Sequence, residues 1–221
     1  MNLQKLLIGF LAAIIGGCST DDPEPPQINV LSQIDIPGNL TTDVWGYIDP
    51  SSGSEYAIVG DFSNLRDGNV TLVDITDPTN PTIASTVPEI TGFDMKTFGN
   101  HLYVTNSDFP SATDDSSRIV DISDPTQPLV VGAFQASHNI FIQEGYLFMS
   151  FEFAPGLRIF DLAPDPTDPQ LVWEDVNPLG GHDVAVIRDR LYDFHGADAT
   201  YIYDVQDPSN PVILGEIRHP N

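Results

Sequence analysis

The sequence is poor in cysteine and in basic residues. Cys18 is the only cysteine among 221 residues, so an exported form must fold without disulfides or a thiol-based metal site. Lys and Arg total 8 against 32 Asp and Glu, and the formal net charge is −24. Because binding to nucleic acid or anionic lipid by charge requires clustered basic side chains, the composition argues against both. The acidic excess fits a protein outside the cytoplasm, a salty habitat or scattered cation sites.

Helical periodicity and catalytic motifs are also lacking. After residue 18, no stretch keeps a convincing helical pattern of apolar residues over three turns. The patterns HExxH, GxSxG and the P-loop do not occur. Hydrophobic residues make up 41% of the chain, which is enough for a core, and the length allows one domain or at most two.

Residues 1–17 have the pattern of a lipoprotein signal peptide. Lys5 is their only charge, and the ten apolar residues from Leu6 to Ile15 are too few for a membrane span, which needs about 20. The segment Ile15-Gly16-Gly17-Cys18 resembles the lipobox of bacterial lipoproteins, in which the cysteine is lipidated and becomes the first residue. The alternative is a buried N-terminal helix with an incidental cysteine.

Residues 18–27 are polar and rich in proline, which predicts a flexible tether between the lipid on Cys18 and the folded domain. We therefore expect an exported bacterial lipoprotein at the outer membrane or cell surface. Its contact with the membrane would be made only through the N-terminal lipid, and nucleic acid is not an expected partner.

The remainder of the chain, 28–221, is a repeat. Four copies of an Asp-Pro element follow aspartates spaced by 47, 40 and 43 residues, and these aspartates are Asp74, Asp121, Asp161 and Asp204. Four short strands rich in Val, Ile, Tyr and Phe surround each copy. Two strands come first, the Asp-Pro element lies at the end of the third strand, and the fourth strand follows the element. The second proline of the element lacks an N–H, so the fourth strand should be the outer edge of its sheet.

Four antiparallel strands per repeat of 40–50 residues are typical of a β-propeller blade, and the expected fold is all-β. The expected blades cover about 42–88, 93–134, 138–175 and 182–217. Residues 28–37 resemble an outer strand without its own blade. Because four full blades and an additional strand do not close, we expect a fragment of a six- or seven-bladed propeller. The alternative is that this strand pairs beside 212–217 or hangs free.

The ordered set of motifs resembles the LVIVP-repeat proteins, and more closely the choice-of-anchor B family of exported bacterial proteins. The matching segments are Asp43–Tyr47, Glu55–Ala57, Val73–Pro78, His138–Ile142 and His182-Asp183. The resemblance covers about residues 30–221 and implies a propeller outside the cytoplasm, anchored here by the lipobox. It implies no known activity.

An aspartate recurs at the end of the third strand in every repeat, and this recurrence indicates a structural role. A charged side chain between apolar neighbours must be hydrogen-bonded or exposed, and a turn N–H is the nearest donor. The other interpretation, a circle of ligands formed by Asp74, Asp121, Asp161 and Asp204, is less favoured because the residue occurs in every blade.

The beginnings of the first strands offer a candidate site. First strands line the axis of a propeller, so their ends can converge in an axial ring of ligands formed by Asp43, Asp94, His138, Asn139, His182 and Asp183. Carboxylates with imidazoles suit a divalent cation, Ca²⁺ or a transition metal, or acid–base chemistry. Capping of each strand by its own Asp or Asn is the alternative. Phe194-His195 is expected at the opposite end of its blade and is therefore not part of the ring.

Two functions remain open on the sequence. One is a surface-anchored binding module that presents a glycan or protein ligand site at the propeller mouth, without catalytic residues. The alternative is an exported hydrolase or lyase that uses the axial His/Asp cluster, with or without a metal. The position of the two imidazoles relative to the carboxylates discriminates between these functions.

Overall fold

The computed structural model describes residues 29–36, 40–64, 67–106, 117–150, 156–175, 181–195 and 199–218. The chain divides into two units, 1–30 and 31–221, and the account below concerns the second. The predicted signal peptide, Cys18 and the tether lie outside the described residues. In the part of the chain that is described, no helix is long and apolar enough to cross a membrane.

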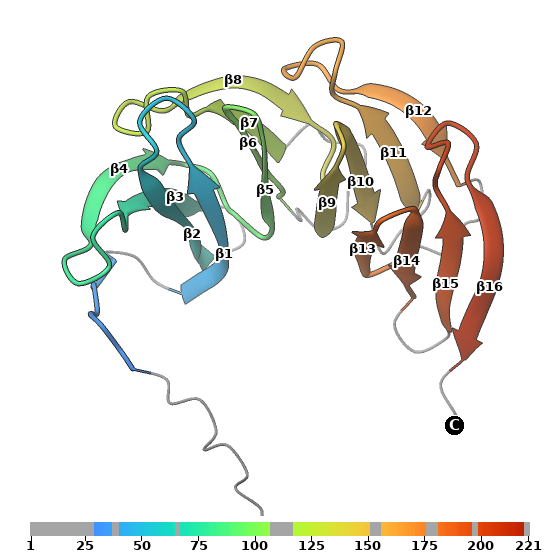
Figure 1. Cartoon of the computed structure of the whole chain (residues 1–221), viewed down its shortest axis with the longest axis horizontal. Helices are drawn as coiled ribbons and strands as arrows, with labels where there is room; N and C mark the ends of the chain where they lie inside the picture. Colours follow the sequence, from blue (N-terminus) through green and yellow to red (C-terminus); the bar gives the residue numbers. More distant parts are fainter. Residues whose placement is uncertain are drawn as a thin grey trace, which may run out of the picture. The chain divides into compact units, whose positions relative to one another are not determined.

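Sixteen strands form four antiparallel sheets, and the described residues contain no helix (Figure 1). The first sheet contains β1 (Leu40–Ile48), β2 (Glu55–Asn64), β3 (Asp67–Asp74) and β4 (Thr82–Pro88). The second contains β5 (Met95–Phe98), β6 (His101–Val104), β7 (Ser117–Asp121) and β8 (Leu129–Phe134). The third contains β9 (Asn139–Gln143), β10 (Tyr146–Ser150), β11 (Leu157–Asp161) and β12 (Gln170–Glu174). The fourth contains β13 (Asp183–Ile187), β14 (Arg190–Phe194), β15 (Ala199–Asp204) and β16 (Val212–Arg218).

In every sheet the strands lie in chain order, and the strand after the Asp-Pro element is at the edge. The prediction of an all-β propeller with four four-stranded blades is therefore confirmed. Tight turns join the first two strands of three blades. In each two-residue loop the first residue has a positive φ, which is 55° at Gly99, 52° at Glu144 and 56° at Arg188. Such conformations match the twist of a β-hairpin, so these turns hold the inner strands in register.

Each repeated aspartate at the end of a third strand accepts a hydrogen bond from the backbone N–H two residues later. The donor–acceptor distances are 2.9 Å at Asp74, 2.8 Å at Asp121, 2.9 Å at Asp161 and 3.0 Å at Asp204. The aspartate of the Asp-Pro element makes a similar turn. Asp77 accepts bonds from the backbone N–H and the hydroxyl of Thr79, at 3.0 and 2.7 Å.

The Asp-Pro turns should make the stability of the protein sensitive to acid. Hydrogen bonds from Thr79, Thr126 and Thr167 lower the pKa values of Asp77, Asp124 and Asp165 below the ordinary value of 3.8. A carboxyl group with a lowered folded pKa stabilises the fold above its unfolded pKa, and this contribution is lost as the pH falls through the folded pKa. We expect the free energy of unfolding in urea to be steady above about pH 5 and to fall below about pH 4.

Asp77→Asn should flatten this acid dependence, because the amide does not titrate. Asp35→Asn is the matched control, since Asp35 is an exposed carboxylate outside the blades. Equal pH profiles for Asp77→Asn and the wild type would show that the turn carboxylate is not linked to folding.

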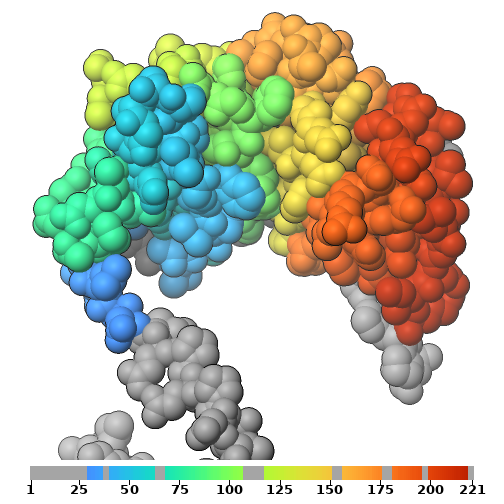
Figure 2. Space-filling model, viewed as in Figure 1, coloured from blue at the N-terminus to red at the C-terminus, as the bar shows by residue number. Residues whose placement is uncertain are grey.

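The core lies between neighbouring sheets rather than in one centre. Between the first and second sheets, Ile58 and Leu72 pack with Leu102 and Val120. Equivalent layers join the second sheet to the third and the third to the fourth. The inner strands of successive sheets are in contact, β1 with β5, β5 with β9 and β9 with β13. In the space-filling view the atoms of successive sheets adjoin one another (Figure 2).

The four blades are not closed, since no described strand of the first sheet pairs with a strand of the fourth. The outward faces of these two sheets are partly apolar and exposed. Val44 and Ile48 of the first sheet are 62% and 64% exposed, and Ile187 of the fourth is 62% exposed. Among the described residues, each interior sheet packs against another sheet on both faces. Each terminal sheet packs against another sheet on one face only.

The outer strand expected over 28–37 is not formed in its described part, 29–36. Residues 31–36 instead lie against the outward face of the first sheet, where Ile34 and Ile36 line an apolar groove with Val59 and Val73. The Ser32 hydroxyl donates to the Pro78 carbonyl at 2.7 Å. No strand among the described residues pairs with this segment, which explains why it does not form a strand.

The position of the segment nevertheless follows the blade pattern. Ser85 of β4 donates its hydroxyl to the carbonyl of Pro125, in the turn of the second sheet, at 2.6 Å. Ser32 makes the same contact with Pro78, in the equivalent turn of the first sheet. The segment 31–36 therefore lies against the first sheet as β4 lies against the second.

Candidate functional site at the inner strand ends

The candidate site lies at the end of the blades where the first strands begin. Because the first two strands of a blade are antiparallel, the end of the second strand lies at the same place. Asp183 of β13 pairs with Phe194 of β14, and the His182 N–H donates to the Phe194 carbonyl at 2.7 Å. His195 is therefore on the same side as Asp183, and the prediction that Phe194-His195 lies at the opposite end is wrong.

Three of the predicted ring residues connect each blade to the next. Each accepts a hydrogen bond from the backbone N–H near the beginning of the following first strand. The pairs are Asp43 with Met95 at 3.0 Å, Asp94 with Ile140 at 2.7 Å and Asn139 with Val184 at 2.8 Å. Each of these side chains therefore caps the first strand of the neighbouring blade, and Asp94 also caps its own strand through the Met95 N–H. Asp183 occupies the fourth equivalent position, and its side chain is 53% exposed.

Asp94 is the most densely bonded of these residues. It is buried and also accepts hydrogen bonds from the Asn139 amide at 2.8 Å and from the Met95 N–H at 2.9 Å. Its other partner is the ammonium of Lys96, which lies 4.5 Å from the centroid of the Trp45 ring. Burial raises the pKa of Asp94, and the Lys96 ammonium opposes the rise. The first three blades are thus joined by a buried charged network.

The other three predicted ring residues form a cluster. The candidate ligand atoms of His138, His182 and Asp183 all lie within 4.8 Å of one another. The two imidazole rings have centroids 4.1 Å apart, and the His182 Nδ1 lies 3.1 Å from a carboxylate oxygen of Asp183. His138 is half-buried, whereas His182 and Asp183 are exposed. The structure therefore brings together the imidazoles with one carboxylate.

Aromatic rings continue this cluster across all four blades. Phe62 of the first sheet stacks on Phe93 with centroids 5.8 Å apart, and Phe93 lies 6.3 Å from the His138 ring. His138 in turn contacts His182 of the fourth blade. We call Phe62, Phe93, His138 and His182 the aromatic row. None of the four is fully buried, so the row offers ring surface to a ligand.

A second histidine–aspartate pair lies below this surface. His195 Nε2 is 2.6 Å from Asp193 Oδ2, and the two side chains are 5% and 1% exposed. The space around the pair is filled, since a Cβ added to Gly181 would lie 2.0 Å from Asp193 Oδ1. The pair was not predicted from the sequence. The signal was Asp193 at an apolar-facing position of β14, where a carboxylate requires a buried partner.

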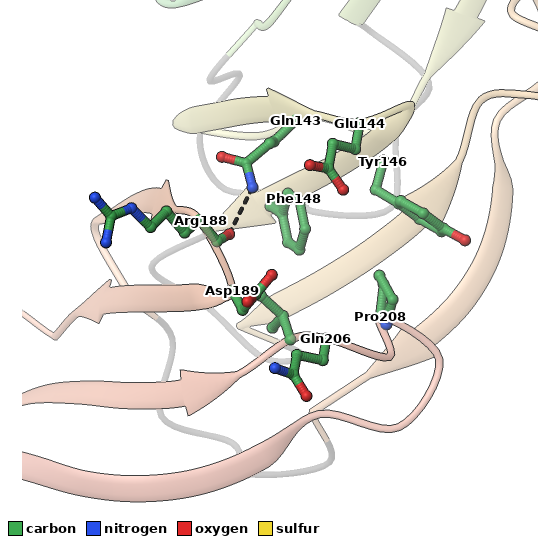
Figure 3. Close-up of a pocket in the computed structure, with 9 residues that line it drawn as sticks. Gln143, Glu144, Tyr146, Phe148, Arg188, Asp189, Gln206 and Pro208 are labelled. Carbon is green, nitrogen blue, oxygen red and sulfur yellow. Dashed lines mark hydrogen bonds between the residues drawn. The ribbon is translucent and has the colours of Figure 1, made fainter.

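A pocket of about 140 Å³ lies between the third and fourth sheets (Figure 3), and it too was not predicted from the sequence. Its lining includes Gln143, Glu144, Arg188 and Asp189 from the inner hairpins. The Gln143 amide donates to the Arg188 carbonyl at 2.5 Å across the pocket. The pocket lies at the turns between first and second strands, and the aromatic row lies at the other ends of these strands.

Comparison with known proteins identifies the repeat. The LVIVD repeat model matches residues 52–88 and 94–136, which correspond to most of the first blade and to the second. No curated protein matches the chain significantly. The predicted LVIVP-type repeat is thereby confirmed under the description LVIVD, and the narrower resemblance to the choice-of-anchor B family stays a prediction. The first two blades of the chain therefore match the LVIVD repeat.

Proposed function

We propose that this protein is an exported, lipid-anchored propeller module that binds a carbohydrate along the aromatic row. The observation that carries the proposal is the row itself, because Phe62, Phe93, His138 and His182 come from all four blades and follow one another within 6.3 Å. Inner strand ends of a propeller are fixed by the packing of the blades, so a site there is built on rigid elements.

Export and anchoring are supported by the N-terminal sequence. Residues 1–17 have a short apolar run, and Cys18 follows two glycines as in a lipobox. The polar segment 19–27 is long enough to separate a lipid from the blades. A lipid on Cys18 would place the protein at the outer membrane or the cell surface.

Charge favours a neutral ligand. A net charge of −24 repels polyanions such as nucleic acid, whereas a neutral glycan has no charge to repel. The row combines ring surface, which can pack on the C–H face of a sugar, with the imidazoles and the Asp183 carboxylate, which can hydrogen-bond to hydroxyl groups. A protein ligand is the other occupant that a test must distinguish.

A glycan array with the mature wild-type protein tests this proposal, followed by affinity measurements on the glycans that bind. Phe93→Ala should weaken binding about 2- to 12-fold, since an aromatic contact is worth about 0.5–1.5 kcal/mol. Tyr192→Ala is the matched control, because Tyr192 lies on the outward face of the fourth sheet. Binding to no glycan, or equal binding by Phe93→Ala and the wild type, would contradict the carbohydrate proposal.

A second candidate function, an exported hydrolase or lyase, is favoured by the proximity of His138, His182 and Asp183. Two imidazoles and a carboxylate can transfer protons or hold a metal that activates water. The test is turnover of chromogenic ester and glycoside substrates by the wild type and its loss in His182→Ala. Equal turnover by the two proteins would exclude the cluster as the catalytic site.

A further inference from the structure

We infer that His138, His182 and Asp183 form a binding site for a divalent transition-metal ion of the Zn²⁺ type. Their candidate ligand atoms lie within 4.8 Å of one another, although the residues come from two blades and His138 is far from the others in sequence. Zn–N and Zn–O bonds of about 2.0–2.2 Å require ligand atoms closer than this, and small side-chain rotations can bring them there because two of the residues are exposed.

The backbone segments that carry the three ligands are held together by Asn139. Its side-chain oxygen accepts from the Val184 N–H at 2.8 Å, which fixes the residue after His138 against the residue after Asp183. Its amide donates to buried Asp94 at 2.8 Å. The Ser137 hydroxyl donates to the Asn139 and Ser150 carbonyls at 2.9 and 2.7 Å. The ligands therefore start from backbone positions fixed by the blade-to-blade network.

The donor set selects the class of metal. Ca²⁺ takes six to eight oxygen ligands, and the cluster offers one carboxylate, since Asp43 and Asp94 are engaged by backbone N–H groups of the next blade. Imidazole nitrogen suits zinc, copper and nickel. Two histidines and one carboxylate also leave coordination positions for water or for an oxygen atom of a ligand.

Charge and position link the metal to the proposed function. A net charge of −24 concentrates cations near the surface, and a cation between His138 and His182 would lie at the end of the aromatic row. The metal would supply an electrophilic contact for a sugar hydroxyl there. In this respect the inference rests on the proposed function, whereas metal binding itself can be measured without any glycan.

The test is isothermal titration calorimetry of the chelator-treated mature protein with ZnCl₂. We expect one zinc ion per chain and a loss of affinity of at least about 100-fold in His138→Ala and His182→Ala, since even residues that only support a ligand contribute 10–100-fold. Asp183→Asn should lose affinity similarly. His101→Ala is the control. His101 is a half-buried histidine at the hairpin end of β5 and β6, opposite the end where the first strands begin, so its substitution should leave the affinity for zinc unchanged.

Circular dichroism and thermal unfolding without metal decide whether each variant is folded. If the histidine variants do not fold, Asp183→Asn still tests the site, because it changes only an exposed side chain. Wild-type protein without stoichiometric zinc binding, or folded variants that bind zinc as tightly as the wild type, would overturn the metal site. Titration with CaCl₂ should give no difference between the wild type and the variants. The glycan array on the same metal-free and zinc-loaded protein separates the two proposals: zinc binding without glycan binding contradicts only the carbohydrate proposal.

Discussion

Cys18→Ala should move the protein from the membrane fraction to an unprocessed or soluble form. Each buried CH₂ of an acyl chain contributes about 0.8 kcal/mol to membrane binding, and several chains on one cysteine anchor a protein stably. The rest of the chain offers no compensating attraction, because its acidic charge repels anionic lipid. Cell fractionation followed by immunoblotting measures the distribution, and the apparent mass of the variant reports whether residues 1–17 are removed.

Ser19→Ala is the matched control for this experiment. It changes the neighbouring residue to the same side chain but keeps the only cysteine. We expect it to fractionate with the wild-type protein. If Cys18→Ala also fractionates with the wild type, the lipoprotein interpretation is wrong, and another part of the protein must account for its location.

The blades could be predicted because each contains local signals that repeat. The Asp-Pro element marks the turn before the fourth strand, and the aspartate before it accepts a turn N–H in every copy. Both signals act within a few residues of the chain, so one sequence contains them completely. The neighbourhood of His138 and His182 was also predictable, since both residues precede a first strand in the repeat alignment.

Contacts between blades were not predictable in the same way. Asp43, Asp94 and Asn139 accept N–H groups from residues 45 to 52 positions later, and only the relative placement of two sheets decides which N–H is nearest. The placement of the sheets is thus the reason that the Asp43 and Asp94 carboxylates accept backbone N–H groups instead of facing a shared metal site. The segment 29–36 has the sequence of a strand but lacks a partner among the described residues, and strand formation depends on this partner.

Asp94→Ala should destabilise the protein by about 3–5 kcal/mol, because removing one member of a buried charged pair leaves its partner unpaired. The Lys96 side chain is only 11% exposed, and it would lose its carboxylate. The Ile140 N–H and the Asn139 amide would also lose their acceptor between the second and third blades. At roughly 2–4 °C per kcal/mol for a chain of this size, the midpoint of thermal unfolding should fall by about 10 °C.

Asp183→Ala is the control that shows whether the loss of stability in Asp94→Ala comes from the buried network or from removing an aspartate at this position of the repeat. Asp183 is the equivalent residue of the fourth blade, but its side chain is 53% exposed, so its removal should change the free energy of unfolding by no more than about 0.5 kcal/mol. The double variant Asp94→Ala/Lys96→Met removes the unpaired ammonium and should recover part of the loss. Thermal and urea unfolding of the four proteins measures these differences. If Asp94→Ala is no less stable than Asp183→Ala, the buried network does not hold the blades together, and the apolar layers between the sheets must do so alone.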